Sequence, residues 1–382
     1  MAKTVDECQV AIIGGGIIGC FIGYYLSARG MDVVVIEKAD LCSGATGAND
    51  ACLMAQSKKP GPKLDMAVES AHMFETLADE LDYDIEYVRK GSMIIQETEE
   101  EAQAMREFCT AQKDAGLPVE FLDQRETHRA QPCLSDHIIG STVCPLDGEV
   151  NPFALLVALD RAIRRYGGRI MTNAPVVGFE VAGNRVTEVA TDRGNVRADV
   201  VVCAAGAYAP LIGNMLRIEI PIRPRRGQIL ITEPIAPLIG AYVMSAKAIA
   251  AKHRAVAVHE NNSGKDDPMQ FGLGMIISQT VNGNMVLGVT HEFVGYDAGT
   301  SIRGLGSIAR YTSTIIPALK GVNVIRTLAG LRPFSEVGGP VIGPIGEYAN
   351  FIVVTGHEGD GVAVAPSTAK GVADKIASGA WG

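Results

Sequence analysis

The sequence lacks any excess of positive charge. Its 34 lysines and arginines are outnumbered by 43 aspartates and glutamates, so the formal net charge is −9. Proteins that attract nucleic acid or anionic membrane surfaces electrostatically need a basic surface. The composition therefore gives no indication of a nucleic-acid or anionic-membrane partner.

The sequence also lacks the cysteine spacing of a zinc or iron–sulfur site. It has eight cysteines, and no two of them form C-x-x-C. Isolated cysteines within apolar runs are typical of buried free thiols in a reducing compartment. We therefore expect this chain to hold no metal.

No apolar run approaches the ~20 residues that a membrane-spanning helix needs. The longest one, from Ile12 to Leu26, is interrupted by glycines, and residues 1–7 are polar and carry no signal sequence. We expect a cytoplasmic protein without a transmembrane segment. With 382 residues, 47% of them hydrophobic, the chain is long enough for two domains.

A glycine-rich motif lies between two apolar runs near the N-terminus. The run 10–13 is typical of a buried parallel strand, a helical pattern extends over 17–29, and the run 32–36 ends at Glu37. In a dinucleotide site Gly14 permits the tight turn, Gly16 the approach of backbone amides to a pyrophosphate, and Gly19 the packing of helix on strand. Glu37 follows at close to the ~20 residues expected for the acid that binds a ribose diol. An ordinary glycine turn in an α/β domain is the alternative.

The segment 41–50 favours a flavin dinucleotide. It is small and polar, with Ser43, Ala45 and Thr46 among its residues. Such a run lets the backbone lie against a large planar group and presents N–H groups to phosphate oxygens. A nicotinamide-binding domain would normally continue here with a strand and a helix. A flexible loop is the alternative.

Two later segments repeat the pattern of a strand that ends in small residues. The run 200–203 is followed by 204–206, and the run 351–355 by the glycine turn 356–361, where a helix starts. A helix N-terminus there would stabilise negative charge on a reduced flavin ring. Three such turns, far apart in sequence, predict a cofactor domain built from discontinuous segments.

Periodicity and turn residues predict the other elements. Helices are expected at 64–81, 97–115, 123–130, 152–166, 302–316 and from the Gly361 turn to about 376, and strands at 87–96, 169–171, 176–181, 186–191, 196–199, 229–232, 275–278 and 285–289. The basic loop 57–63 is interpreted as a solvated loop, a phosphate site or a partner contact. Arg223, Arg225 and Arg226 line a polar site or form a solvated turn.

The predicted fold class is α/β, with two domains. Segments 1–83, 146–216 and 325–382 would form a Rossmann-like FAD-binding domain, and segments 84–145 and 217–324 a sheet-rich α+β substrate domain.

The chain resembles the FAD-dependent D-amino-acid oxidase superfamily, which includes glycine oxidase and sarcosine oxidase, over essentially its whole length. The resemblance rests on the glycine motif with Glu37-Lys38 and on residues 43–49, 204–206, 226–228, 330–333 and 356–361. The shorter stretches 57–62, 232–234 and 290–297 are similar to the flavin (beta) subunits of heteromeric dehydrogenases for opines (octopine or nopaline), proline and hydroxyproline, and of hydrogen cyanide synthase.

The resemblance implies removal of hydride from the carbon that bears an amine, giving an imine that water hydrolyses. Arg332 matches the arginine that binds the substrate carboxylate, and a guanidinium offers a planar fork to such a group. A structural arginine is the alternative. His291, Glu292 and Tyr296 are candidates for the substrate side, with ordinary packing as the alternative for each.

The expected cofactor is FAD, held non-covalently, because no cysteine lies near 330–333 and no histidine precedes His72, the places of covalent links in relatives. The resemblance also allows FMN or an iron–sulfur cluster shared with or held by a partner subunit. The residues expected to contact the cofactor are Gly14, Gly16, Ile17, Ile18, Gly19, Glu37, Lys38, Ser43, Ala45, Thr46, Val176, Ala205, Gly206, Gly356, Gly359, Asp360, Gly361 and Val362.

Three functions stay open from the sequence. The first is a dehydrogenase subunit of a hetero-oligomer that passes electrons to a partner. The second is a self-sufficient oxidase of the glycine, sarcosine or D-amino-acid type, in which oxygen reoxidises the flavin. The third is a flavin-binding electron-transfer subunit without a substrate of its own, which Arg332 argues against.

Overall fold

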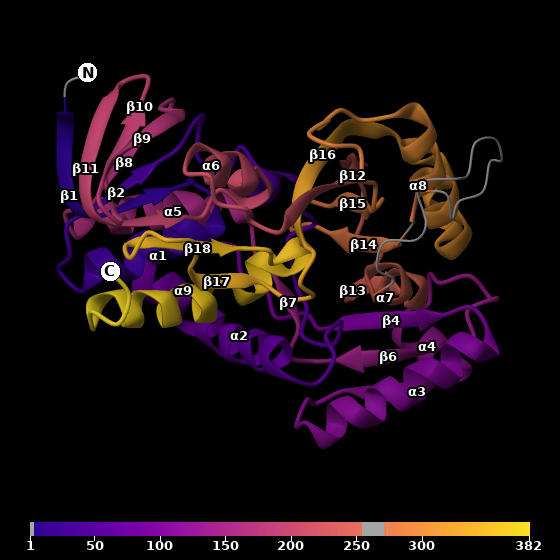
Figure 1. Cartoon of the computed structure of the whole chain (residues 1–382). Coiled ribbons are helices and arrows are strands. Elements are labelled where there is room, and N and C mark those ends of the chain that lie inside the picture. Colours follow the sequence, from indigo (N-terminus) through magenta and orange to yellow (C-terminus); the bar gives the residue numbers. More distant parts are fainter. Residues whose placement is uncertain (1–3, 254–270, 273) are drawn as a thin grey trace.

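The computed structural model describes residues 4–253, 271–272 and 274–382. Two large sheets lie side by side, and the N- and C-terminal ends of the chain are both beside the first of them (Figure 1). The chain passes between the two halves several times, so each half is assembled from segments that are distant in sequence.

The first sheet has a parallel centre. Its path is β17-β18-β11-β1-β2-β8, the pairs from β18 to β8 are parallel, and β10 and β9 add an antiparallel hairpin to β11. Long apolar runs suit such central strands because both faces are covered. The strands are β1 (Thr4–Ile13), β2 (Val33–Ile36), β8 (Arg169–Met171), β9 (Val176–Ala182), β10 (Arg185–Thr191), β11 (Gly194–Cys203), β17 (Val341–Pro344) and β18 (Phe351–Thr355).

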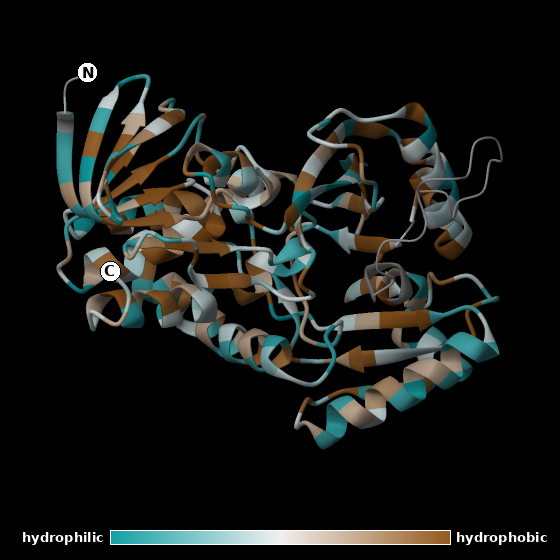
Figure 2. Cartoon of the chain, viewed as in Figure 1, coloured by the Kyte–Doolittle hydropathy of each residue, from teal (hydrophilic) through white to brown (hydrophobic). Residues whose placement is uncertain are grey.

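Alternate side chains of β1 enter two different cores. Val10 and Ile12 pack against four helices on one face of the sheet, whereas Ala11 and Ile13 pack against the hairpin and a short helix on the other. β1 and β11 begin with polar residues and become hydrophobic toward their carboxyl ends (Figure 2). The four helices are α1 (Ile17–Ala28), α2 (Pro62–Leu81), α5 (Pro152–Arg165) and α9 (Gly361–Ala377), and the short one is α6 (Ala209–Met215).

The second sheet is mostly antiparallel. Its order is β16-β12-β15-β14-β13-β4-β6-β5, with a parallel pair between β13 and β4. The strands are β4 (Ser92–Gln96), β5 (Glu120–Asp123), β6 (Gly140–Cys144), β12 (Ile222–Pro234), β13 (Tyr242–Ser245), β14 (Ile276–Gln279), β15 (Asn284–Gly288) and β16 (Val324–Ser335), and the helices of this half are α3 (Glu99–Asp114), α4 (Gln124–Ala130), α7 (Ala246–His253) and α8 (Ile302–Ile315).

Short elements connect the halves. A two-stranded sheet pairs β3 (Cys52–Leu53) with β7 (Gly148–Glu149), and 3₁₀ turns occupy η1 (Ala45–Ala48), η2 (Gly206–Tyr208), η4 (Pro317–Gly321) and η5 (Glu358–Asp360). Among the described residues, no helix combines the length and the apolar character needed to cross a membrane.

The α/β fold class is confirmed, as are the predicted helices, to within a few residues. Three strand predictions need correction. Residues 196–203 form one continuous strand, β11, the strand expected at 87–96 begins only at Ser92, and residues 223–228 belong to β12, where a turn was one expectation. In each case the pairing partner comes from a distant segment, which local periodicity does not reveal.

The bounds of the two domains stay a proposal. The proposed cofactor segment 325–382 begins inside β16, which pairs with β12 along almost its whole length in the second sheet. Gly330 and Pro333 are residues that usually interrupt strands, and no strand was expected there. Through β16 the second sheet reaches the region where the strands of the first sheet end.

Candidate active site

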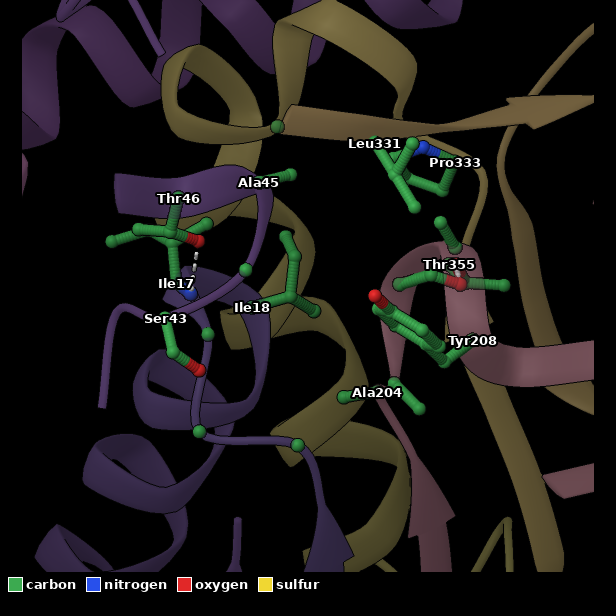
Figure 3. A pocket seen from close by; sticks show the side chains of 18 of the residues that line it. Ile17, Ile18, Ser43, Ala45, Thr46, Ala204, Tyr208, Leu331, Pro333 and Thr355 are labelled. Atoms are coloured by element: carbon green, nitrogen blue, oxygen red, sulfur yellow. Dashed lines mark hydrogen bonds between the residues drawn. The ribbon is translucent and has the colours of Figure 1, made fainter. Parts of the chain in front are cut away.

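A cavity of about 440 Å³ lies at the carboxyl ends of β1, β2 and β11. Figure 3 shows Ser43, Ala45 and Thr46 on one side of it and Tyr208, Thr355 and Leu331 on the other. In parallel α/β sheets this edge is where ligands bind, because helix N-termini and connecting loops meet there.

The glycine motif has the backbone geometry that the sequence predicts. Gly14 has φ +118°, and a Cβ atom there would lie 2.5 Å from the carbonyl oxygen of Ala204. A Cβ atom at Gly19 would overlap the carbonyl oxygen of Gly14. Gly19 does not line the cavity; its part is to let α1 pack closely on β1.

The N-terminus of α1 is open toward the cavity. Its N-cap is Gly16, which supplies no side-chain cap, and the Ile17 N–H donates to Thr46 Oγ1 at 3.1 Å (Figure 3). A Cβ atom at Gly16 would meet the protein only at Thr46 Oγ1, 3.3 Å away. The protein itself therefore has room for a Cβ atom at position 16, and glycine is needed there to leave space for a ligand in the cavity. A helix N-terminus of this kind favours a phosphate.

The carboxylate of Glu37 is fixed at the cavity wall. Its Oε2 accepts from the Gly15 N–H at 2.7 Å and its Oε1 from the Ala39 N–H at 2.9 Å. A carboxylate has about four lone-pair positions, so two remain for a diol. Gly15 is a cavity residue that the sequence prediction omitted.

The ring of Tyr208 contacts both Lys38 and Tyr296. Lys38 Nζ lies 3.2 Å from the ring centroid of Tyr208, and the Tyr296 ring stacks on Tyr208 with centroids 5.3 Å apart. Tyr208 and Lys38 line the large cavity, whereas Tyr296 does not and is 40% exposed. The sequence analysis did not predict Tyr208 as a site residue. It lies in the η2 turn beside Ala205 and Gly206, which were predicted.

The C-terminal turn brings a second open helix N-terminus to the cavity. Gly359, Gly361 and Val362 line it, and the N-cap of α9, Asp360, makes no capping hydrogen bond. His357 is buried beside it, and burial lowers the pKa of its imidazole to about 4. The ring is therefore neutral at physiological pH.

Two of the three lysines in the basic loop 57–63 pair with one buried acid. Lys58 is buried, and its Nζ lies 2.9 Å from Asp360 Oδ1, while Lys63 Nζ lies 2.5 Å from Asp360 Oδ2. The burial of Lys58 corrects the interpretation as a wholly solvated loop, whereas the phosphate site and the partner contact stay predictions. Their ion pairs join the loop to the start of α9.

A smaller cavity of about 60 Å³ adjoins the first. Four residues line both cavities: Asp50, Arg332, Glu358 and Gly359. The predicted His291 lines only the smaller one, and its Nδ1 lies 2.8 Å from the carbonyl oxygen of Gly272. These four residues form the junction between the two cavities.

Arg332 is held at this junction by backbone. Its Nη1 donates to the carbonyl oxygen of Thr290 at 3.0 Å, and its guanidinium lies over Gly227, where a Cβ atom would overlap it. Burial lowers the pKa of Arg332, and the nearby carboxylates of Asp50 and Asp360 act in the opposite direction. A guanidinium has five N–H donors, so others remain for a carboxylate.

Gly227→Ala is expected to act through Arg332. The new methyl group takes the place of the guanidinium, which can move because it ends a flexible side chain. We expect FAD content and melting temperature close to those of the wild type and a kcat/KM at least about tenfold lower, which corresponds to about 1.4 kcal/mol. Gly240→Ala, where a Cβ atom meets nothing within 4 Å, is the control. Unchanged kcat/KM in Gly227→Ala would show that Arg332 does not act from this position.

Tyr242 is a candidate that the sequence did not reveal. Its side chain is fully buried and lines the smaller cavity, and its hydroxyl lies beside the side chains of Asp50 and Cys52. Burial raises the pKa of this phenol, and the negative charge of Asp50 acts in the same direction. The hydroxyl is therefore protonated and able to donate into the cavity.

The other predicted arginines have internal partners. Arg226 Nη2 lies 2.8 Å from Glu292 Oε2, and Arg226 Nη1 lies 2.6 Å from Asp297 Oδ2. Arg225 is buried in an ion pair with Glu358. Glu292 also accepts from Gln228 Nε2 at 2.6 Å. Glu292 is thus engaged in holding β12, which leaves it poorly placed to contact substrate.

Most predicted cofactor residues share the large cavity. Those that line it are Gly14, Gly16, Ile17, Ile18, Glu37, Lys38, Ser43, Ala45, Thr46, Val176, Ala205, Gly206, Gly359, Gly361 and Val362, and those that do not are Gly19, Gly356 and Asp360. An acid beside an open helix N-terminus, glycine turns and a cavity of this size fit a dinucleotide such as FAD. The described part of the chain contains no group of three histidine, cysteine or acidic residues arranged to hold a metal.

Comparisons with known proteins agree with this geometry. Residues 9–375 match the sequence profile of the family described as FAD dependent oxidoreductase (DAO). The crystal structure of glycine oxidase from Geobacillus kaustophilus is 26% identical, with a TM-score of 0.86, covering 98% of this chain and 95% of that one. L-proline dehydrogenase from P. horikoshii is 26% identical, with a TM-score of 0.85, covering 98% and 94%. Hydrogen cyanide synthase subunit HcnC from Pseudomonas aeruginosa is 25% identical over 404 residues, which cover 95% of this chain and 90% of that protein.

Proposed function

This chain belongs to the FAD-dependent oxidoreductase (DAO) family, and from that premise we propose that it oxidises an amino acid at the carbon bearing its amine, most favourably a secondary amine. The product is an imine that water hydrolyses. Electrons then pass to a partner subunit or another acceptor. Similarity to a glycine oxidase and an L-proline dehydrogenase supports this substrate class.

The observation that carries the proposal is the position of Arg332. It lines both cavities, so a carboxylate on its guanidinium would lie in the smaller one while the rest of the ligand faces the larger one. A planar guanidinium binds a carboxylate through two parallel hydrogen bonds, which fixes orientation as well as charge. Tyr242, in the same small cavity, would donate a further hydrogen bond to that carboxylate.

When bound, FAD supplies the acceptor for the hydride. The chain would hold it with the N-terminus of α1, Glu37 and the open N-terminus of α9, whose partial positive charge favours negative charge nearby. Arg332 and Tyr242 would orient the substrate, because the protein's main contribution to such a reaction is positioning. His357, neutral through its lowered pKa, would add no positive charge there.

The size of the smaller cavity favours a small substrate. A water molecule needs roughly 10–15 Å³ of such volume, so about 60 Å³ has room for only a handful of heavy atoms. Proline, hydroxyproline, sarcosine or glycine suit this space better than octopine or nopaline. The opine reading of the resemblance is therefore the less favoured form of the proposal.

Anaerobic mixing of the FAD-loaded protein with each of these six compounds tests the proposal. Bleaching of the oxidised flavin absorbance by at least one small amino acid is expected, faster than with octopine or nopaline. Absence of bleaching by all of them, with dithionite still reducing the flavin, would favour an electron-transfer subunit without its own substrate.

We also propose that the natural acceptor is a partner chain. The similarity to a hydrogen cyanide synthase subunit and the resemblance to flavin subunits of heteromeric dehydrogenases support it. The purified chain alone should reduce an artificial acceptor quickly and oxygen slowly. Peroxide release in equal amounts to oxidised substrate, at a rate matching the artificial acceptor, would instead identify a self-sufficient oxidase.

A further inference from the structure

We propose that the Asp50 carboxylate receives the cationic amine of the substrate, opposite Arg332, and thereby selects zwitterionic amino acids over simple carboxylates. This inference rests on the proposed function, because it concerns the same cavity. It adds a residue that neither the glycine motif nor the arginine context indicates.

Asp50 lies where the two cavities meet. It follows the η1 turn, lines both cavities, and its Oδ1 accepts from the Cys52 N–H at 3.3 Å, which orients the carboxylate. Arg332 also lines both cavities. A cation and an anion therefore border the same small space, the arrangement that matches an amino acid with its carboxylate and ammonium groups.

The charge of Asp50 affects the pKa values of two other residues of the cavity. Burial lowers the pKa of Arg332 and raises that of the Tyr242 phenol, and the charge of Asp50 opposes the first shift and adds to the second, so its carboxylate is close to both groups. Nearby, Lys58 and Lys63 both pair with Asp360, and Arg225 pairs with Glu358.

This arrangement has a consequence for ligand choice. A carboxylate without an amine gains the attraction of Arg332 but meets the like charge of Asp50, whereas a zwitterion gains from both. Because the cavity is partly shielded from water, the difference between the two ligands should be larger than between exposed charges.

Two ligands of nearly the same shape separate these cases. The first is 2-aminoisobutyrate, which has an ammonium group but no hydrogen on its α-carbon and so is not oxidised. The second is pivalate, in which a methyl group replaces the ammonium. Titration of the flavin absorbance of the FAD-loaded protein gives the dissociation constant of each. We expect the wild type to bind 2-aminoisobutyrate at least about tenfold more tightly than pivalate.

The variant Asp50→Asn should lose most of this preference, and Asp50→Glu should retain part of it, because only the latter keeps the charge. Asp40→Asn, an exposed carboxylate that lines neither cavity, is the control for net charge and should retain it fully. The inference is wrong if wild-type protein binds pivalate as tightly as 2-aminoisobutyrate, a result that needs no variant to fold. It is also wrong if Asp50→Asn keeps the wild-type preference with full FAD content. Neither readout requires turnover, so failure of the proposed oxidation would be seen separately, in the bleaching experiment.

Discussion

Arg332→Ala is expected to lower kcat/KM for the amino-acid substrate by about thirtyfold to several thousandfold. Truncating one partner of a shielded charge pair costs about 2–5 kcal/mol, and each 1.36 kcal/mol is tenfold in rate. FAD content should stay normal, because Arg332 contacts Thr290, which follows β15, and Gly227 in β12, and not the glycine motif. Steady-state kinetics with an artificial acceptor, together with the flavin-to-protein ratio, measure both quantities.

Arg332→Lys should recover only part of the loss, because an ammonium keeps the charge but loses the fork. A substrate whose carboxylate is converted to an amide should react slowly with the wild type and lose little more in Arg332→Ala. If both variants keep the wild-type kcat/KM on the acid substrate with full FAD, Arg332 is structural. The carboxylate would then have to bind at another hydrogen-bond donor of the small cavity, such as Tyr242, since Lys58, Arg225 and Arg226 are already paired with acids.

The variant Gly16→Val is expected to purify without FAD and without activity. Gly16 has an extended φ of −85°, and the protein leaves room for a Cβ atom there, with Thr46 Oγ1 as its nearest neighbour. The added side chain would instead fill the space in front of the N-terminus of α1, where a pyrophosphate would lie. The apoprotein should remain folded, so circular dichroism should match that of wild-type protein stripped of FAD.

Gly178→Val is the matched control, because Gly178 lies in β9 and a Cβ atom there meets nothing within 4 Å. It should keep full FAD. Stoichiometric FAD in Gly16→Val would remove the glycine motif from the cofactor site. An unfolded Gly16→Val protein would contradict the argument from available space, and Gly16→Ala would then be compared for affinity by FAD titration.

The part of the molecule built on the first sheet was largely predictable, because the sequence signals that specify it are local. The order of strand, glycine turn, helix, strand and acid occupies one short stretch, and each residue type there has one geometric use, such as the positive φ of Gly14 or the close packing at Gly19. The small residues after β11 and β18 were likewise recognisable as strand ends. These segments share a cavity because parallel strands end at the same edge of the sheet.

The second sheet and the contacts between the two sheets were less predictable. Strand β16 contains Gly330 and Pro333, which argue locally against a strand, and only its pairing with β12 makes it one. Tyr242 lies in a short apolar segment that resembles any buried strand, and Lys58 lies in a basic loop that resembles a solvated one. Their roles depend on neighbours many residues away, which leave no trace in local periodicity.

The sequence by itself determined the cofactor edge of this protein, because a dinucleotide site is built from backbone turns whose residue types are restricted by sterics. It also singled out Arg332 through the resemblance of residues 330–333 to a known arginine context. Tertiary structure alone decided where that guanidinium lies, since the space over Gly227 is formed by a different strand. It alone decided that Asp50 and Tyr242 border the same small cavity as Arg332, because the meeting of three distant segments depends on how they pack and not on spacing along the chain.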